Sequence, residues 1–350
     1  IDNVALFTQW RYEPNERWAF DFGLRYDTED YQFQRSDTVA SIIPPECIIN
    51  IGVTLPCVVA AQALQRPAEP LQDDNYAVWL PRAAVTYNLS DEASVFASIR
   101  RGYRAGGATL APNDAGQTIV VTYDPEFLIG YEAGWRSTWL EGRLTFNGTA
   151  FYSDYKDQQV VVQDSREFSI TENAGSTALY GIELLADYRV SETWSLYGNL
   201  GLLGTRIDEF LFDAFTDPPV DLAGNELDDA PPVTMTVGLS YDQRQGVFGN
   251  ISVNYRAESW SDVFNLGPAE LGPGISEEID AAYLVNARLG YRFEGLTVTG
   301  FVTNLLDEDE PESLNFADGG VLNGTGGFRP TGEYNMRQPQ TFGVSLDYAF

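Results

Sequence analysis

The sequence predicts an all-β fold, a transmembrane antiparallel up-and-down β-barrel. Three observations predict it: apolar and polar residues alternate along the whole chain, short and long connections alternate between these segments, and the last segment ends on an aromatic residue, Phe350. A period of two is typical of strands with one apolar and one polar face. The segments exceed the roughly 5 to 6 residues that are usual in soluble sheets, which favours strands that cross a membrane.

Four segments show the alternation most clearly. Their apolar faces carry Trp18, Phe20, Phe22, Leu24 and Tyr26; Tyr180, Ile182, Leu184, Ala186 and Tyr188; Leu296, Val298, Gly300 and Val302; and Phe342, Val344, Leu346, Tyr348 and Phe350. Several of these faces have aromatic residues at both ends and aliphatic residues between them, as lipid-facing strands do where Tyr and Trp lie at the two water interfaces. We therefore expect the apolar faces to contact membrane lipid.

The connections alternate strictly in length. Tight turns lie near residues 13–16, 90–92, 141–142, 191–192, 242–246 and 294–295, and long connections run over about 32–75, 105–122, 157–177, 208–231, 259–280 and 307–336. Bacterial outer-membrane barrels have short periplasmic turns and longer extracellular loops. The long connections are therefore expected to be extracellular.

Thirteen strands are expected from this alternation. They fall at roughly 3–12, 17–31, 76–88, 93–104, 123–139, 143–156, 178–190, 193–207, 232–241, 247–257, 281–293, 296–306 and 337–350. Single-chain bacterial barrels use an even number of strands. We therefore expect further strands to precede residue 1.

The composition excludes several classes of protein. The formal charge is −30 and the isoelectric point is about 4.1, so the chain repels nucleic-acid phosphates and no nucleic-acid partner is expected. No stretch reaches the roughly 18 to 20 apolar residues of a membrane-spanning helix, and the mean hydropathy is −0.21. Membrane contact must then come from apolar strand faces, with the acidic residues in loops or in the lumen.

Histidine is absent, and the two cysteines lie in one Pro-rich segment. The absence of histidine removes Ser-His and Cys-His catalysis, imidazole metal ligands and His-based pH switching, so we expect neither an enzyme nor a cofactor or metal site. Cys47 and Cys57 are too far apart for a CxxC motif. They are expected to form a local disulfide in an oxidising compartment, the alternative being two unpaired thiols.

Short motifs in their order and spacing resemble the C-terminal barrel region of TonB-dependent outer-membrane receptors, over nearly the whole chain. The motifs are Arg101-Gly102-Tyr103-Arg104-Ala105-Gly106-Gly107, Tyr131-Glu132-Ala133-Gly134, Leu140-Glu141-Gly142-Arg143-Leu144, Ala150-Phe151-Tyr152, Asp154-Tyr155-Lys156-Asp157, Asn173-Ala174-Gly175, Tyr180-Gly181-Ile182-Glu183-Leu184 and Asn304-Leu305-Leu306-Asp307. The resemblance implies a 22-stranded barrel in the cell outer membrane, plugged by an N-terminal domain. Residues 1–350 are then the C-terminal portion, and the plug and the segment that engages the TonB complex are expected outside this sequence.

The terminal apolar face resembles the signal by which the barrel-assembly machinery accepts outer-membrane proteins. It comprises Phe342, Val344, Leu346, Tyr348 and Phe350. A lipid-facing strand explains the same residues equally well, and the two interpretations are compatible.

Arginine residues on the polar register are the first candidates for substrate binding. Arg100 and Arg104 share one face, with Arg136, Glu132 and Arg25 on nearby strands. The planar fork of an Arg guanidinium matches carboxylate, catecholate or phosphate oxygens. The favoured alternative is pairing with acidic residues of the wall, Glu132, Glu183 and Asp187, or with acids of the plug.

Aromatic residues near the strand ends are the second candidates. Tyr103, Tyr155, Trp260 and Phe264 could stack on an aromatic siderophore or a sugar, although most such residues are interface residues of the membrane girdle. The acidic runs Asp307 to Glu312, Asp228-Asp229 and Asp73-Asp74 invite comparison with calcium sites, but they lack EF-hand spacing and fit solvated loops better.

The expected function is energised outer-membrane import of a scarce large nutrient, with a ferric siderophore as the favoured cargo. Oligosaccharide or another chelate is the first alternative, and a passive porin-like channel is the second. An outer-membrane enzyme is disfavoured by the missing histidine, and a soluble β-sandwich is disfavoured by the long strands.

Overall fold

The computed structural model describes residues 2–33, 38–39, 64–65, 72–112, 118–163, 169–212, 219–267, 278–317 and 331–348. All regular secondary structure within these ranges is β-strand. None of the described residues belongs to a helix long and apolar enough to span a membrane. The chain divides into two compact units, residues 1–6 with 26–78 and residues 7–25 with 79–350, and the sites described below lie in the second unit.

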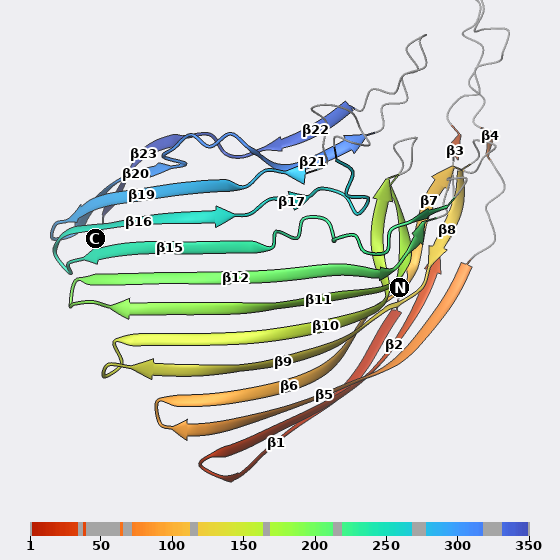
Figure 1. The fold of residues 1–350 in the computed structure, drawn as a ribbon, viewed down its shortest axis with the longest axis horizontal. Coiled ribbons are helices and arrows are strands. Elements are labelled where there is room, and N and C mark those ends of the chain that lie inside the picture. Colours follow the sequence, from red (N-terminus) through yellow and green to blue (C-terminus); the bar gives the residue numbers. More distant parts are fainter. Residues whose placement is uncertain are drawn as a thin grey trace, which may run out of the picture. The chain divides into compact units, whose positions relative to one another are not determined.

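Thirteen strands form one sheet, in which each strand pairs with the next long strand along the chain (Figure 1). They are β1 (Asp2–Asn15), β2 (Trp18–Phe33), β5 (Gln72–Ser90), β6 (Ala93–Arg104), β9 (Glu126–Trp139), β10 (Leu144–Gln163), β11 (Ser169–Arg189), β12 (Trp194–Glu209), β15 (Val233–Asp242), β16 (Gly246–Arg256), β19 (Ala282–Arg292), β20 (Leu296–Thr303) and β23 (Thr341–Tyr348). The described pairs from β5 to β23 are antiparallel. The predicted up-and-down order and the strand number are confirmed.

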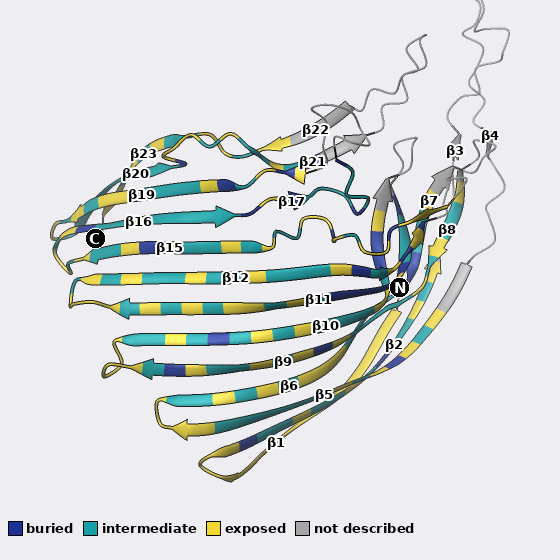
Figure 2. Cartoon of the chain, in the orientation of Figure 1, coloured by how far each residue is buried: buried dark blue, intermediate teal, exposed yellow. Residues whose placement is uncertain are grey.

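The registers confirm that one face of the sheet is apolar. Tyr180 and Ile182 of β11 are 48% and 43% exposed on that face, and Glu183 and Asp187 lie on the other. On β23 the predicted residues Phe342, Val344, Leu346 and Tyr348 are all more than 60% exposed, and Phe350 lies outside the described residues. Exposed residues recur along most of the long strands (Figure 2). An exposed apolar surface of this extent indicates contact with another apolar phase.

The long connections contain short strands of their own. Pairs are formed by β3 (Thr38–Val39) with β4 (Leu64–Gln65), β7 (Gly107–Pro112) with β8 (Thr118–Tyr123), β13 (Leu211–Phe212) with β14 (Val220–Asp221), β17 (Ser259–Trp260) with β18 (Glu278–Ile279), and β21 (Pro311–Ala317) with β22 (Thr331–Met336). Such ribbons pair their backbone groups locally, so they add ordered structure at the end of the sheet opposite the short turns.

The region 157–177 differs from the expected long loop. β10 continues to Gln163 and β11 begins at Ser169, with register pairs from Gln158↔Ala174 to Gln163↔Ser169. The β-branched residues Val160 to Val162 favour extended structure, and the partner strand supplies Ile170 and Thr171 opposite them. The interpretation as a long loop was therefore wrong for residues 158–163 and 169–174, which form an antiparallel ladder.

A buried apolar core lies at the end of the sheet opposite the short turns, and we call it the loop core. It comprises Val160, Ile170, Ala174, Ile207, Phe210, Phe212, Leu222, Leu227 and Val263. These residues come from β10, β11, β12 and the connections at 210–232 and 259–267. Burial of apolar surface stabilises the connections against the ends of the long strands.

Aromatic rings on the polar face lie over glycines of the neighbouring strand. The pairs are Phe96 with Gly134, Phe151 with Gly181, Tyr197 with Gly238, Phe248 with Gly290, and Phe301 with Gly343. A Cβ on Gly343 would overlap the ring of Phe301, whose Cε1 would lie only 2.5 Å away, far inside van der Waals contact. Each ring therefore requires a glycine at one position of the partner strand, which specifies the register of the two strands.

We predict that Gly343→Ala lowers the stability of the folded sheet by about 1 to 3 kcal/mol, the usual cost of overpacking, because the new Cβ would meet only atoms of the Phe301 ring. The measurement is the urea midpoint of unfolding in detergent micelles. Gly300→Ala is the matched control, because a Cβ there would meet only the Leu289 carbonyl oxygen, at 3.8 Å. Equal midpoints for the two variants would contradict the role of the aromatic–glycine pairs.

Candidate functional site

The polar face of β5, β6 and β9 carries a patch of arginines. Arg82 and Arg100 lie directly opposite each other in the register, and Nη2 of Arg100 is 3.0 Å from Oε1 of Glu132. The arginine and glutamate side chains are 58% and 30% exposed, so their ion pair contributes little to stability. Pairing with the wall, the favoured interpretation for Arg100, is present in the structure. Arg82 was not among the predicted residues.

The structure places Arg104, Arg136 and Tyr155 on the same face as Arg100. Arg104 lies opposite Glu126, and Arg136 stacks on the ring of Phe96, with Cζ 4.5 Å from the ring centroid. The register aligns Tyr155 with Leu128 on this face. Four of the predicted candidates are thus brought onto one surface.

Tyr103 and Trp260 are not part of that surface. Tyr103 follows the odd-numbered register of β6 and lies on the apolar face, opposite Phe127. This position fits the membrane-interface role that was the alternative for the aromatic candidates. Trp260 lies in β17, where it pairs with Glu278, and its carbonyl accepts a hydrogen bond from the Asp229 N–H. Cys47 and Cys57 lie outside the described residues.

Two further arginines form a second site at the ends of the last strands. Arg256 is the last residue of β16 and lies on the polar face, and the charge of Arg337 acts on it directly. Nε and Nη2 of both guanidinium groups are buried and have no hydrogen-bond partner. The Nη1 of Arg256 donates to the Glu312 carbonyl at 3.4 Å. Within the part of the chain that the structure describes, neither arginine forms an ion pair.

The unpaired donors of Arg256 and Arg337 are costly. A buried hydrogen-bond donor without an acceptor costs about 1 to 3 kcal/mol, and more when the group is charged. Carboxylates lie in the surroundings: Asp229 and Glu312 act on Arg256, and Arg337 opposes the rise in the pKa of Glu310 that burial causes. None of them pairs with either guanidinium group. The two forks therefore offer donors to an anion of another molecule or segment.

The Asn304-Leu305-Leu306-Asp307 motif holds the segment that carries Arg337. Asn304 is 3% exposed and has a φ of +51°. Its Nδ2 donates to the carbonyls of Glu308 and Gln338, at 2.8 and 3.2 Å. Nε2 of Gln340 donates to the Leu305 carbonyl at 2.7 Å. The residues on both sides of this network are thereby fixed, and Arg337 is adjacent to one of them. The sequence alone contained no signal that the charge of Arg337 would act on Arg256.

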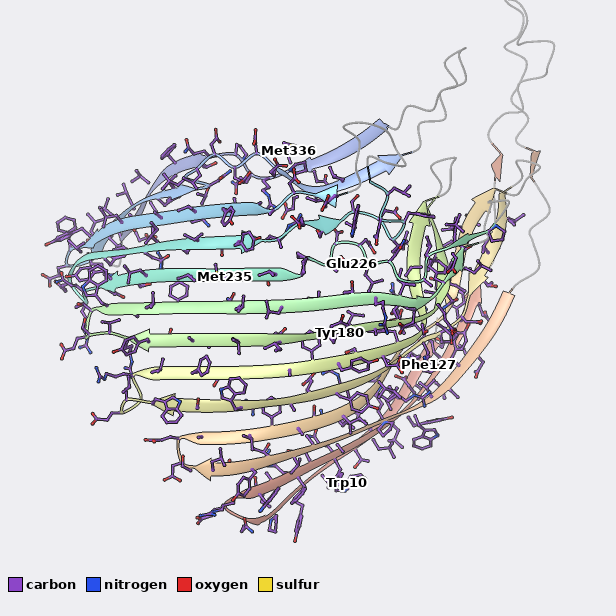
Figure 3. All side chains as sticks on the ribbon, viewed as in Figure 1. Trp10, Phe127, Tyr180, Glu226, Met235 and Met336 are labelled. Carbon is purple, nitrogen blue, oxygen red and sulfur yellow. The ribbon has the colours of Figure 1, made fainter. Side chains whose placement is uncertain are left out.

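Hydrogen bonds reinforce the loop core described above. Nδ2 of Asn225 donates to the carbonyls of Val263 and Phe264, at 2.9 and 3.1 Å. Nδ2 of Asn265 donates to the Glu226 carbonyl at 3.2 Å, and the Glu226 N–H donates to Oδ1 of Asn265 at 2.7 Å. The Glu226 label marks this region beside the start of β15 in Figure 3. These bonds join the two connections into one ordered surface.

A buried carboxyl group lies within the same surface. Burial raises the pKa of Asp262 to about 6, against the lowering effect of a hydrogen bond from the Phe264 N–H, and the charge of Asp228 raises it further. Burial also raises the pKa of Asp228. No three acidic side chains within the described residues are close enough together to hold a metal ion.

Comparison with protein families identifies the chain. Residues 1–305 match the family model described as TonB dependent receptor-like, beta-barrel. The chain belongs to this family. The TonB-dependent receptors are outer-membrane multi-pass β-barrels, so the apolar face of the sheet contacts lipid and the polar face lines the barrel interior.

Individual relatives agree with this assignment. The metal-pseudopaline receptor CntO of Pseudomonas aeruginosa (strain UCBPP-PA14) is 26% identical over 303 residues, which are 85% of this chain and 37% of the receptor. The fold matches the ferric yersiniabactin uptake receptor FyuA from Yersinia pestis with a TM-score of 0.72 and 18% identity, over 99% of this chain and 45% of that chain. It matches the closed form of the ferric-catecholate import receptor Fiu from K12 E. coli with a TM-score of 0.69 and 17% identity, over 99% and 44%. The chain thus spans less than half the length of each of these TonB-dependent receptors.

We predict that the stability of the loop core depends on the protonation of Asp262. Its folded pKa of about 6 lies above the ordinary value of 3.8, so the contribution of the protonated form is fully present below about pH 4 and is lost as the pH rises through about 6. Asp262→Asn keeps the acceptor oxygen and removes the charge. At pH 7.5 it should stabilise residues 259–267 by about 3 kcal/mol, measured by hydrogen exchange.

The control for this prediction is Asp221→Asn. Asp221 is exposed in the same region and accepts a hydrogen bond from the Ala223 N–H. This variant should keep the pH dependence of the parent protein. Hydrogen exchange that does not slow in Asp262→Asn at pH 7.5 would contradict the assignment.

Proposed function

We propose that this chain is the C-terminal portion of a TonB-dependent receptor that imports an anionic metal chelate, with a ferric siderophore as the cargo. Import is energised through the TonB complex, which a region outside this sequence engages. The observation that carries the proposal is the pair of arginines, Arg256 and Arg337, with buried donors that no acceptor meets. Carboxylate, catecholate and phosphate oxygens are the groups that such planar forks bind best.

The positive charge of the arginine pair favours an anionic chelate over an oligosaccharide and over a passive channel. An oligosaccharide is neutral and would leave two positive charges without a counterion. A passive channel requires no such pair. The names of the relatives support the same class of cargo, because they describe receptors for metal-pseudopaline, ferric yersiniabactin and a ferric catecholate. Nothing in these relatives points to an enzyme.

The first arginine patch takes a secondary role in the proposal. Arg100 is already paired with Glu132, and Arg104 lies opposite Glu126 in the register, so each of these arginines has a carboxylate of the wall as a neighbour. Arg136 and Tyr155 lie on the same interior face. We assign to this patch contact with the passing substrate or with acidic residues of the plug. Phe342, Val344, Leu346, Tyr348 and Phe350 are assigned to recognition by the barrel-assembly machinery, through their apolar register.

We expect the double variant Arg256→Gln and Arg337→Gln to lose affinity for anionic chelates. Each charge-assisted hydrogen bond contributes roughly 1.5 to 3 kcal/mol, so the dissociation constant should rise by about 10- to 100-fold. Binding is followed by the quenching of tryptophan fluorescence in the whole purified receptor. The ligands are the ferric complexes of a citrate-type and a catecholate-type siderophore, together with a neutral ferric hydroxamate and a maltodextrin.

The control variant is Arg244→Gln, in the short turn between β15 and β16, which should bind every ligand as the parent protein does. Unchanged binding of both anionic chelates by the double variant would overturn the proposal, as would tight binding of the maltodextrin by the parent. Uptake measurements in cells distinguish energised import from the porin alternative. Uptake that continues after the proton-motive force is dissipated would favour a passive channel.

A further inference from the structure

The lipid-facing register contains a row of charged residues at one level. Moving outward from the short turns along β6, β10 and β12, the first charged residues on this register are Arg101, Asp154 and Arg206. The registers connect them through Ile129 and Ala178: Arg101↔Ile129, Ile129↔Asp154, Asp154↔Ala178 and Ala178↔Arg206. The row therefore runs across five neighbouring strands, perpendicular to them.

An aromatic row lies one step closer to the short turns. Tyr131, Tyr152 and Tyr180 are aligned by the registers of β9, β10 and β11, and Tyr180 is visible on β11 in Figure 3. Tyrosine concentrates where the hydrocarbon meets the headgroups. From Asp154 to Leu144 there are ten strand positions, about 33 Å along the strand, which for a strand tilted by about 40° gives an apolar band of roughly 25 Å. The charged row thus lies at headgroup level.

Arg101 differs from the other basic residues near this level. Nε of Arg206 is 2.6 Å from Oδ1 of Asp208, and Nζ of Lys156 is 3.6 Å from Oδ1 of Asp154. Arg101 has no carboxylate partner among the described residues. Its Cζ lies 4.8 Å from the ring centroid of Phe127, and its Nη1 donates to the Trp79 carbonyl at 3.5 Å. Most of its guanidinium donors remain available to an anion.

An apolar groove adjoins Arg101. It has a volume of about 490 Å³, and its apolar lining comprises Phe22, Pro81, Ala83, Ile99 and Ile129. The groove forms where the short side chains of Pro81 and Ala83 lie among larger ones. Arg82 and Arg100, which belong to the interior register, also line the groove. Ile99, Ile129 and Arg101 share the lipid-facing register, so the apolar side of the groove faces the membrane.

We propose that Arg101 and this groove bind one lipid with a phosphate-bearing anionic headgroup. The guanidinium group binds the phosphate at headgroup level, and an acyl chain occupies the groove beneath it. Charge complementarity commits the site to an anionic lipid: the chain has a net charge of −30 and repels such headgroups elsewhere, and a zwitterionic lipid would bring no net charge to Arg101. Arg101 lies on the lipid-facing register, whereas Arg256 lies on the interior face. The lipid site can therefore be tested independently of the proposed substrate site.

The test uses the whole receptor, purified in detergent and examined by native mass spectrometry with palmitoyl-oleoyl phosphatidylglycerol or phosphatidylcholine. The parent protein should retain one phosphatidylglycerol in preference to phosphatidylcholine. Arg101→Gln should reduce phosphatidylglycerol occupancy about tenfold and bring it to the level of phosphatidylcholine. Ala83→Phe, which fills the groove and keeps the arginine, should reduce the occupancy of both lipids.

The matched control is Arg206→Gln, at the same level on the lipid-facing register but paired with Asp208. It should keep the phosphatidylglycerol preference of the parent. Heat-dependent gel migration checks that each variant is folded. The proposal is overturned if the parent shows no preference between the lipids, if Arg101→Gln retains the preference, or if Arg206→Gln loses it to the same extent.

Discussion

The fit of aromatic rings over glycines of the next strand is the constraint on which the other features of this barrel wall depend. Phe96, Phe151, Tyr197, Phe248 and Phe301 each lie over a glycine across the strand pair. In a sheet with a period of two, a slip by one residue would exchange the lipid-facing and interior faces of a whole strand. Packing at one position per pair therefore maintains the positions of residues far from the rings. The Phe96–Gly134 and Phe151–Gly181 pairs specify two of the four strand pairs across which Arg101, Asp154 and Arg206 are aligned.

Much of the fold could be predicted from the sequence because its signal is local. Whether Tyr180 and Ile182 face lipid follows from the alternation of their own segment, and the thirteen strands follow from thirteen such segments. The alternation of apolar and polar residues no longer predicts the strand at Val160 to Val162. A strand that leaves the membrane no longer needs one apolar face, so the alternation ends although the hydrogen-bonded ladder continues to Gln163.

The sites were less predictable, because they depend on residues that are distant in the sequence. Arg100 and Arg104 were predictable from strand register within one segment, and the structure places them on the expected face. Arg256 and Arg337 come from segments separated by two long strands and their connections, and no periodicity relates them. Asp262 is similar: its burial depends on the folding of two connections around Val263 and Leu222, and single-segment patterns contain no information about that packing.

The long hairpin of β10 and β11 limits how the outer surface of the receptor can move. From Asp154, at headgroup level, the two strands stay paired as far as Gln163, nine residues further, with one break at Asp157, whose φ is +54°. This is about 30 Å at roughly 3.3 Å per residue. Bending this arm would break several backbone hydrogen bonds at once, and its apolar residues Val160 and Ile170 are already buried in the loop core. The outer part of the β10–β11 pair is therefore expected to stay rigid relative to the loop core. In the proposed import, a movement that encloses the substrate would therefore leave this arm in place.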